Sequence, residues 1–418
     1  MSDAWALLES GDISGLLRHL RFTVETMEMA EVARLIERAA AASGFDDLRD
    51  AAGAVAAVPA DPQRLYDFGY ACIERGVSFL AIPALRTAQA AVPDSAALLG
   101  ELVSALEDEN RHADAVAALE AFPGDLGAWP GRYLLAHNAL MAGDLERSER
   151  EAARLPEPDD ERWRPARDRL RGTLARARAV RAVSPLDHRD LRGWHFALGG
   201  SVLLTLSPYG FEQGMTGRYA FVSDSYGDCR RAVDRLRLVL DAAGRRPRAV
   251  GLLDDRSSTI LGLAVAGVLG LPAERFAPGS PGVLVVAYDL SEAGATGLRE
   301  RAEGQVLFER ATRWTDPPPV SADVSGFLHQ TVMPPWGERM MAGEDGEVRR
   351  VPEDRRPVEE LAAEIMRAAP ATDGGDGETP PDTDEGLAAL VAAVRAEWLT
   401  GPRYGVRSPG PVASSRFM

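Results

Sequence analysis

Lysine is absent from this sequence of 418 residues, so all 47 of its lysine-or-arginine positions are arginines. A P-loop binds nucleotide phosphates through a lysine, and a protein kinase needs a lysine on one of its strands. A pyridoxal-phosphate enzyme forms a Schiff base with a lysine. The absence of lysine therefore excludes three classes of enzyme. Arginine, serine and backbone amides remain as the groups that could hold a phosphate.

Cysteine is scarce as well, because Cys72 and Cys229 are the two in the chain and lie far apart in sequence. We therefore expect no disulfide framework. The sequence has no CxxC or HExxH motif, and its six histidines form no ligand-spaced cluster, so we predict no metal site. It also lacks an apolar run long enough to span a membrane and a basic, apolar signal peptide. These absences predict a cytoplasmic protein without a membrane partner.

The acidic charge is unevenly spread along the chain. The formal net charge is −16, and residues 341–385 alone hold fourteen acidic residues and five arginines, a net charge of −9. An acidic chain disfavours nucleic acid as a partner, and we expect none. Because more than half of the charge lies in this one segment, the charge does not exclude a phosphate ligand elsewhere. The abundance of Ala, Arg, Gly and Pro is typical of a GC-rich bacterial genome.

The first 156 residues have the pattern of successive amphipathic helices, in a chain long enough for two or three domains. In residues 62–95, small and large apolar residues recur at fixed places in two consecutive helices. Gly69 and Ala81 would let these helices approach closely, and Leu85 would fill the space below them. The positions that carry this pattern are Leu65, Phe68, Gly69, Cys72, Ala81, Leu85 and Ala88.

This pattern resembles the tetratricopeptide repeat. Two further units, which begin near Ala96 and Trp129, match less closely, so the resemblance covers about 95 residues. Residues 4–53 would cap the stack of repeats. The resemblance implies a helical repeat domain over residues 1–158, with a face that binds a protein or peptide partner.

Residues 162–181 hold eight arginines and one acidic residue, Asp168. A basic helix of this kind could bind RNA or phosphate, or it could be a connector whose guanidinium groups pair with acidic neighbours. Because Leu170, Leu174 and Ala177 form an apolar stripe beside the charges, we favour a connector helix within residues 159–185.

From residue 186 the periodicity changes to short apolar runs of strand length that alternate with helical stretches. This alternation predicts an α/β domain over residues 186–340, a three-layer, Rossmann-like parallel sheet covered by helices. The expected strands are residues 201–207, 248–253, 282–288 and 305–309, and the expected helices are residues 228–243, 258–269 and 297–302.

After residue 340 the chain is acidic and rich in Gly and Pro. We expect a tail over residues 341–418 with two short helices, at residues 358–367 and 385–399. Residues 400–418 are expected to be disordered.

Two loops of the α/β domain carry polar groups at the ends of predicted strands, where parallel sheets bind ligands. The first loop contains Asp255, Arg256, Ser257 and Ser258 and opens a predicted helix. Hydroxyl groups and backbone amides at such a helix start can hold a phosphate, and Arg256 would add charge. The alternative is that Asp255, Ser257 or Ser258 is a helix N-cap that needs no ligand.

The second loop, residues 288–296, follows the strand Gly282–Tyr288. Its spacing resembles the phosphoribosyl-pyrophosphate loop of type I phosphoribosyltransferases. The resemblance implies that Asp289 binds a ribose hydroxyl, while Gly294 and Thr296 belong to the turn around the 5-phosphate. The first loop would then hold the pyrophosphate, and Mg²⁺ would be the cofactor.

The chain departs from that family at several places. Tyr288 replaces the first acidic residue, and Ala293 replaces the first threonine. The short connection between Leu271 and Val283 leaves no room for the family's flexible catalytic loop. We therefore assign no catalytic residue and no cofactor, and we expect Mg²⁺ only if the transferase hypothesis holds.

Other residues that could take part in chemistry have simpler interpretations. Residues 223–228 are rich in serine and aspartate and precede a predicted helix, so we interpret them as helix caps. Cys229 is interpreted as a small buried residue. Trp314, with Arg310 and Arg313 near it, and Trp336 could form the floor of a pocket for a flat ligand, but we favour the interpretation that these tryptophans anchor loops on the core.

Two hypotheses for function remain. In the one we favour, helical repeats bind a protein or peptide partner and the α/β domain is a non-catalytic or ligand-sensing module. In the alternative, the α/β domain is a phosphoribosyltransferase-like enzyme, or a nucleotide- or phosphate-binding domain whose ligand is a phosphorylated small molecule.

Overall fold

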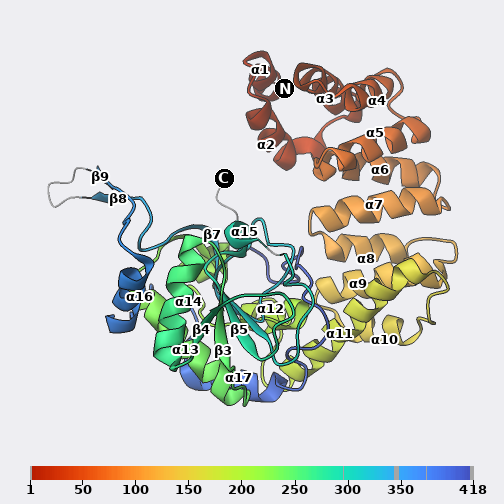
Figure 1. Ribbon diagram of the computed structural model, residues 1–418. Helices are drawn as coiled ribbons and strands as arrows, with labels where there is room; N and C mark the ends of the chain where they lie inside the picture. The colour runs from red at the N-terminus through yellow and green to blue at the C-terminus, as the bar shows by residue number, and fades with distance from the viewer. Residues whose placement is uncertain (1, 295, 343–347, 373, 415–418) are drawn as a thin grey trace. The chain divides into compact units, whose positions relative to one another are not determined.

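The computed structural model describes residues 2–294, 296–342, 348–372 and 374–414, and these form two compact units (Figure 1). The helical unit comprises residues 1–167, and the α/β unit comprises residues 168–418. The predicted fold class is confirmed, because a series of paired helices precedes a domain with a parallel sheet. Among the described residues, no helix is long and apolar enough to cross a membrane.

In the helical unit each long helix from α3 onward packs against the next along the chain. The helices are α1 (Ser2–Glu9), α2 (Ile13–Thr23), α3 (Met29–Ser43), α4 (Asp46–Ala57), α5 (Pro62–Glu74), α6 (Ser78–Ala91), α7 (Ala96–Asp108), α8 (His112–Glu120), α9 (Tyr133–Met141) and α10 (Leu145–Ala153). Short helical turns, η1 (Val24–Thr26), η2 (Gly127–Arg132) and η3 (Glu161–Trp163), connect some of them.

The pair of helices α5 and α6 shows how the sequence specifies this unit. Asp61 caps α5, since its carboxylate accepts a hydrogen bond from the Arg64 amide, and Pro62 occupies the first turn. A Cβ atom on Gly69 would lie 2.7 Å from Leu85 Cγ, so glycine is required where the two helices approach. The predicted close approach is therefore confirmed.

Polar contacts connect successive pairs of helices. Ser78 donates to Asp108 at 2.7 Å, and the Phe79 amide donates to Glu109 at 3.1 Å, so α6 begins against the end of α7. Asn138 on α9 bonds the buried His112 ring at 2.8 Å and donates to a carboxylate of α7. These contacts join neighbours along the chain.

The arginine-rich segment forms α11 (Arg164–Arg181), which spans the boundary between the units. Its apolar stripe is buried as predicted, because Leu170, Leu174 and Ala177 are each less than 5 % exposed.

The sheet of the α/β unit has the strand order β1-β7-β6-β5-β3-β4, with β2 also paired to β7. All of these described pairings are parallel. The strands are β1 (Val202–Leu203), β2 (Tyr219–Ser223), β3 (Ala249–Leu252), β4 (Ala273–Arg275), β5 (Val283–Ala287), β6 (Val306–Arg313) and β7 (Val324–Met333).

Strands β1, β3 and β5 lie in predicted runs, and β6 begins in the fourth run but continues to Arg313; β2, β4 and β7 were not predicted. Residues 297–302 form turns rather than the predicted helix, and the short helix α15 (Leu290–Ala293) lies just before them. Gly294, with a φ of +78°, ends α15 in a conformation that favours glycine.

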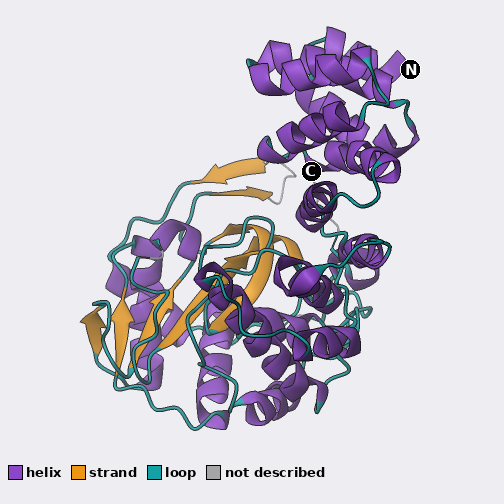
Figure 2. Ribbon diagram, turned by 90° about the vertical axis from the view of Figure 1, so that its right-hand side faces the viewer, coloured by secondary structure: helices purple, strands orange, loops and turns teal. Residues whose placement is uncertain are grey.

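Helices lie on either side of the twisted sheet (Figure 2). Helix α14 (Arg256–Leu269) packs on β3 and β5 and beside α13 (Tyr226–Ala242), and α12 (Leu191–Gly199) packs against β1. The two helices predicted for the C-terminal segment are present as α16 (Val358–Arg367) and α17 (Asp384–Val394). Helix α16 covers α14 and α13, and α17 packs against α13.

Residues 400–414 are ordered against the α/β unit, so the predicted disorder is wrong for them; residues 415–418 lie outside the described residues. Arg403 is 2 % exposed and makes a two-pronged ion pair with the buried Asp323, and Val412 is fully buried. A second structure absent from the prediction is the hairpin of β8 (Arg339–Ala342) and β9 (Val348–Val351).

The chain changes direction between the neighbouring strands β3 and β5. From β3 it continues outward to β4, whereas from β5 it continues through β6 to β7 on the other side. Parallel sheets bind ligands at such a point, beyond the carboxyl ends of the strands. The two loops singled out in the sequence follow these two strands.

Candidate functional site

The two predicted loops meet where the sheet changes direction. Asp255 is the N-cap of α14, and its carboxylate accepts from the Ser258 amide at 2.8 Å. The hydroxyl of Ser258, which is fully buried, accepts from the Tyr288 amide at 2.9 Å. The N-cap interpretation therefore holds for Asp255, and Ser258 joins the loop after β3 to the loop after β5.

The other two polar groups of the first loop contact the chain itself. Arg256 donates to the backbone carbonyls of Asp354 and Arg356 at 2.9 and 2.8 Å. Ser257 accepts from the indole of Trp336 at 3.0 Å, and that tryptophan is 2 % exposed. Arg256 and Ser257, which were expected to bind a phosphate, therefore bind the segment around β8 and β9 instead.

In the second loop, Asp289 caps the short helix α15, because it accepts from the amide and the hydroxyl of Ser291 at 2.8 and 2.5 Å. Asp255 and Asp289 follow the adjacent strands β3 and β5, so they lie at one edge of the sheet. Partial burial, with these two acids nearby, raises the pKa of the Glu292 carboxyl. Gly294 and Thr296 are exposed, and residue 295 between them lies outside the described residues.

A buried ion pair that sequence reasoning missed lies beside these loops. Asp224 follows β2 and accepts from Arg310 of β6 at 2.7 Å, and both side chains are at most 4 % exposed. Asp224 also accepts from the Tyr288 hydroxyl at 2.9 Å and from the Cys229 thiol at 3.3 Å. The phenol of Tyr288 thus donates a hydrogen bond to this ion pair. Tyr288 occupies the position where the transferase resemblance would place an acidic residue.

The interpretation of residues 223–228 as helix caps is confirmed for Ser225, whose hydroxyl accepts from the Asp228 amide at 3.0 Å. It fails for Asp224, whose carboxylate accepts from the Arg310 guanidinium and the Cys229 thiol and caps no backbone amide of α13, a helix described in full. Burial, with Asp224 nearby, raises the pKa of the Cys229 thiol well above its ordinary value, so this thiol stays protonated and is not an activated nucleophile.

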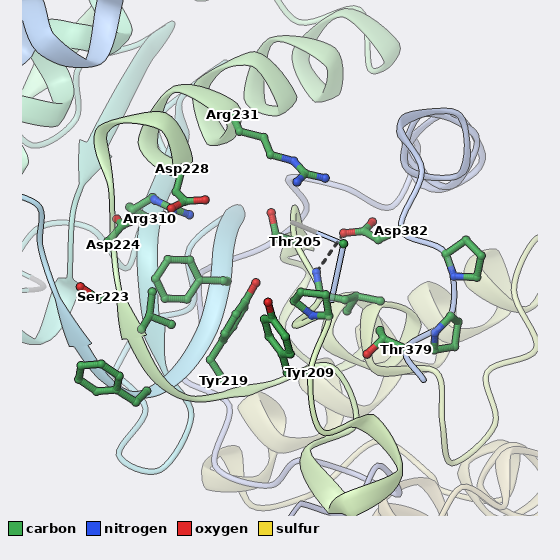
Figure 3. A pocket seen from close by; sticks show the side chains of 18 of the residues that line it. Thr205, Tyr209, Tyr219, Ser223, Asp224, Asp228, Arg231, Arg310, Thr379 and Asp382 are labelled. Carbon is green, nitrogen blue, oxygen red and sulfur yellow. Dashed lines mark hydrogen bonds and ion pairs between the residues drawn. The ribbon is translucent and has the colours of Figure 1, made fainter. Parts of the chain in front are cut away.

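A cavity of about 420 Å³ opens next to this ion pair (Figure 3). It is lined by residues 205–209 after β1, by β2, by the first turn of α13 and by residues 374–382, together with Arg310 and Phe327. Arg310, Asp224 and Asp228 lie at one end of the cavity and Thr379 and Asp382 at the other (Figure 3).

The far wall of the cavity is fastened by ionic and polar contacts. Asp382 accepts from Arg192 at 2.6 Å and from Arg235 at 2.7 Å, and Arg235 is 3 % exposed. Thr379 donates to the Ser207 carbonyl at 3.0 Å. The C-terminal segment that carries this wall is more than 40 residues from β6 and β7 and about 150 residues from β2, which is why no local pattern indicates the cavity.

Beneath the sheet edge lies a second buried polar network, centred on Glu309. Its carboxyl contacts the Leu290 amide at 2.8 Å and the Thr312 hydroxyl at 2.6 Å, and Ser325 links Thr312 to His195. Burial raises the pKa of Glu309 to about 8 and lowers the pKa of His195 to about 4. At neutral pH both groups are therefore uncharged, and the network is one of neutral donors and acceptors.

In the helical unit, four aromatic residues form a stacked group, called here the aromatic group: Trp129, Tyr133, His137 and Trp163. The rings of Trp129 and Tyr133 stack at 5.4 Å between centroids, and those of Tyr133 and His137 at 5.8 Å. The Trp163 ring lies 5.7 to 5.8 Å from the first two. All four are partly exposed. The four-residue spacing of Tyr133 and His137 was a sequence signal for one face of α9, whereas Trp129 has an extended backbone and precedes that helix.

Among the described residues, no group of three or more His, Cys, Asp or Glu side chains could hold a metal ion. Both cysteines are free and buried. Comparison of the chain with protein-family models, with curated proteins and with solved structures finds no match.

Proposed function

We propose that the protein is an interaction protein of the cytoplasm, whose helical unit consists of tetratricopeptide-like repeats that bind a peptide segment of a partner protein. Its α/β unit, which resembles a degenerate phosphoribosyltransferase, is a non-catalytic module. The observation that carries this proposal is the partly exposed aromatic group on the last helices of the helical unit.

Aromatic rings that are neither buried nor isolated are suited to recognition. Tryptophan and tyrosine dominate the binding energy of many interfaces because they supply a large rigid surface with few rotatable bonds. Their faces attract arginine and lysine side chains, and they also form the grooves that bind proline-rich segments. We therefore expect the partner segment to contain proline or a basic residue, which lies on the Tyr133 and Trp163 rings.

The non-catalytic assignment of the α/β unit rests on how its loops are used. Ser257 and Arg256 bind Trp336 and two backbone carbonyls, and Ser258 holds the loop after β5. A transferase needs these groups to be open to substrate. The protonated Cys229 supplies no nucleophile in their place.

A peptide-selection experiment tests the proposal. A random peptide library is selected against the full chain, and each enriched peptide is then titrated against a variant that carries Tyr133→Ala and Trp163→Ala. We expect enrichment of sequences with proline or a basic residue, and a loss of about tenfold or more in affinity in the double variant. Tyr70→Ala is the matched control, because Tyr70 is an exposed aromatic residue of α5, outside the aromatic group.

If peptides bind the double variant as tightly as the unchanged chain, the binding face lies outside the aromatic group. If no peptide is enriched at all, the interaction proposal fails.

One observation favours the alternative of a phosphoribosyltransferase-like, phosphate-binding domain: Asp255, Ser258 and Asp289 lie at one edge of the sheet. Titration calorimetry with phosphoribosyl pyrophosphate and Mg²⁺ separates the two functions. We expect no heat of binding, because the loop donors already have partners within the chain. Binding that is lost in the variants Asp289→Asn and Thr296→Ala would establish the alternative; Thr296 is exposed, so its variant should fold.

A further inference from the structure

Two side chains of opposite charge line the cavity without an ionic partner. Asp228 and Arg231 belong to the first two turns of α13, and both extend from that helix toward the cavity (Figure 3). Over the part of the chain that the structure describes, neither forms an ion pair, whether with the other or with a third residue. Both are partly exposed, so each remains charged and can contact a ligand.

The other charges at the cavity are already balanced. The buried ion pair of Asp224 and Arg310 neutralises itself. Behind the far wall, two arginines share two carboxylates: Arg192 and Arg235 bind Asp382, and Arg235 also binds Asp384. The charges left to select a ligand are therefore one positive and one negative, both on α13.

This arrangement disfavours a ligand with a charge of one sign. A simple anion that binds Arg231 would lie near the unpaired carboxylate of Asp228, and a simple cation on Asp228 would lie near the guanidinium. A ligand that carries an anionic and a cationic group satisfies both side chains at once. Such a ligand is a zwitterion.

Both charged groups are held in place and keep bonding capacity. One oxygen of Asp228 accepts from the Ser225 hydroxyl at 2.6 Å, and within the described ranges its other oxygen has no partner. Arg231 donates to the Ala371 carbonyl at 3.3 Å, which uses one of the five N–H groups of a guanidinium. A guanidinium can bind a carboxylate with two parallel hydrogen bonds, and a carboxylate binds an ammonium group strongly.

Aromatic rings supply the apolar part of the cavity. Tyr209 is 48 % exposed, and the rings of Tyr209 and Tyr219 project into the cavity with their hydroxyls toward its interior (Figure 3). The buried Phe327 ring packs edge-on against Tyr219 at 5.5 Å between centroids. Such rings favour contact with another ring. The volume of about 420 Å³ lies near the lower end of the range for small-molecule sites, so the ligand is small.

We propose that this cavity binds a free aromatic α-amino acid. The carboxylate of the ligand pairs with Arg231, its ammonium group pairs with Asp228, and its ring packs against Tyr209 and Tyr219. An α-amino acid carries its two charges on either side of one carbon atom, which suits two side chains one helical turn apart. This inference goes beyond the peptide-binding role of the helical unit, because it gives the α/β unit a ligand of its own.

Calorimetric titration of the full chain tests the inference. The probes are phenylalanine, tyrosine and tryptophan, each with two smaller analogues. The arylpropionic acid lacks the ammonium group, and the arylethylamine lacks the carboxylate. We expect at least one amino acid to bind, and both of its analogues to bind about tenfold more weakly or less, because each loses one charged hydrogen bond.

Two variants assign each charge to its partner. Asp228→Asn should weaken binding of the amino acid about tenfold but not that of the arylpropionate, which has no ammonium group to lose. Arg231→Gln should weaken binding of the amino acid about tenfold but not that of the arylethylamine. A variant that only disturbed the fold would weaken all probes alike. Asp241→Asn and Arg237→Gln are the matched controls, since both residues are exposed on α13 outside the cavity, and should leave binding unchanged.

Three results would overturn the inference. The first is that none of the three amino acids binds at about 1 mM. The second is that an arylpropionate or an arylethylamine binds as tightly as its amino acid. The third is that Asp228→Asn and Arg231→Gln each leave the amino acid bound as tightly as before, or weaken it no more than the analogue that lacks the corresponding charge.

Discussion

The helical unit and the α/β unit use their charged residues in opposite ways. In the helical unit, ion pairs such as Arg111 with Asp114 and Arg111 with Glu25 are partly exposed, whether their residues are near or far apart in sequence. In the α/β unit, arginines are buried and bind acids from remote segments, as Arg403 does with Asp323 and Arg310 with Asp224. The first unit has its ion pairs in contact with water, whereas the second also depends on ion pairs that are buried.

This difference has an energetic consequence. An exposed ion pair gains little, because water screens it and two long side chains lose freedom. A buried pair need not stabilise relative to an apolar core, but removing one partner leaves an uncompensated charge in the interior. The α/β unit should therefore be much more sensitive than the helical unit to the loss of a single charged group.

The largest effect is expected at Asp323. Its carboxylate accepts from Arg403, from Arg301 at 2.6 Å and from the Leu307 amide at 2.8 Å. Asp323→Ala should lower the free energy of unfolding of the α/β unit by about 3–5 kcal/mol, because two arginines lose their partner. Hydrogen-exchange mass spectrometry of the full chain, which reports each unit separately, measures the change.

The matched control is Asp114→Ala in the helical unit, where the expected change is about 0.5 kcal/mol or less. A similar loss of protection in both variants would break the comparison between the two units. Unchanged hydrogen-exchange protection of β6 and β7 in Asp323→Ala would also contradict the comparison.

The helical unit should respond instead to changes in apolar packing. Gly69→Ala would place a methyl group within 3.1 Å of three Leu85 atoms, and we expect a loss of about 2–3 kcal/mol, confined to the helices around α5 and α6. Thermal unfolding with hydrogen exchange locates the loss. Adding Leu85→Ala should recover part of it, and a double variant less stable than either single one would show that the two residues do not share this contact.

The elements that could be predicted from the sequence are those fixed by neighbouring residues. Asp61, Pro62 and Gly69 specify a helix and its partner within one short stretch, and the apolar runs of β3 and β5 mark strands buried on both faces. Strand β7 was not predicted because its sequence, VSGFLHQTVM, mixes glycine, histidine and glutamine with apolar residues. Its burial depends on neighbours that are remote in the chain.

The candidate site shows the same limit. The N-cap role of Asp255 could be predicted, because an aspartate three residues before Ser258 is a local signal. No local signal connects Asp224 with Arg310, which are 86 positions apart, or Ser257 with Trp336, which are 79 apart. For the same reason, residues 400–414 were wrongly expected to be disordered: Arg403 finds its partner 80 positions away.

Stability should also depend on pH, and the carboxyl whose pKa is raised furthest, Glu309, lies in the α/β unit. Burial raises the pKa of Glu309 from 4.5 to about 8, so the folded chain keeps a proton that the unfolded chain loses. The free energy of unfolding contributed by this group therefore falls as pH rises from about 4.5 to about 8. His195 and His329, whose pKa burial lowers from 6.5 to about 4, act in the opposite sense below pH 6.5.

Between pH 6.5 and 8 the glutamate acts without the histidines, and stability should fall by about 1.4 kcal/mol per pH unit, about 2 kcal/mol in total. Glu309→Gln, which keeps donors and acceptors without titrating, should abolish this fall. Urea unfolding of both chains at a series of pH values measures the slope. Equal slopes would show that Glu309 ionises normally in the folded chain.

The smallest expected effect compares one helix cap in each unit. Asp61 accepts a single hydrogen bond, from the Arg64 amide, whereas Asp190 caps α12 and also accepts from Ser184 and from the Leu186 amide. Replacement by alanine should cost about 1 kcal/mol for Asp61 and up to about 2 kcal/mol for Asp190. Urea unfolding, with hydrogen exchange to assign each loss to its helix, measures both. The larger loss at Asp190 is expected because its carboxylate also holds the chain that enters the helix, so equal losses would mean that capping alone sets the stability of both helix starts.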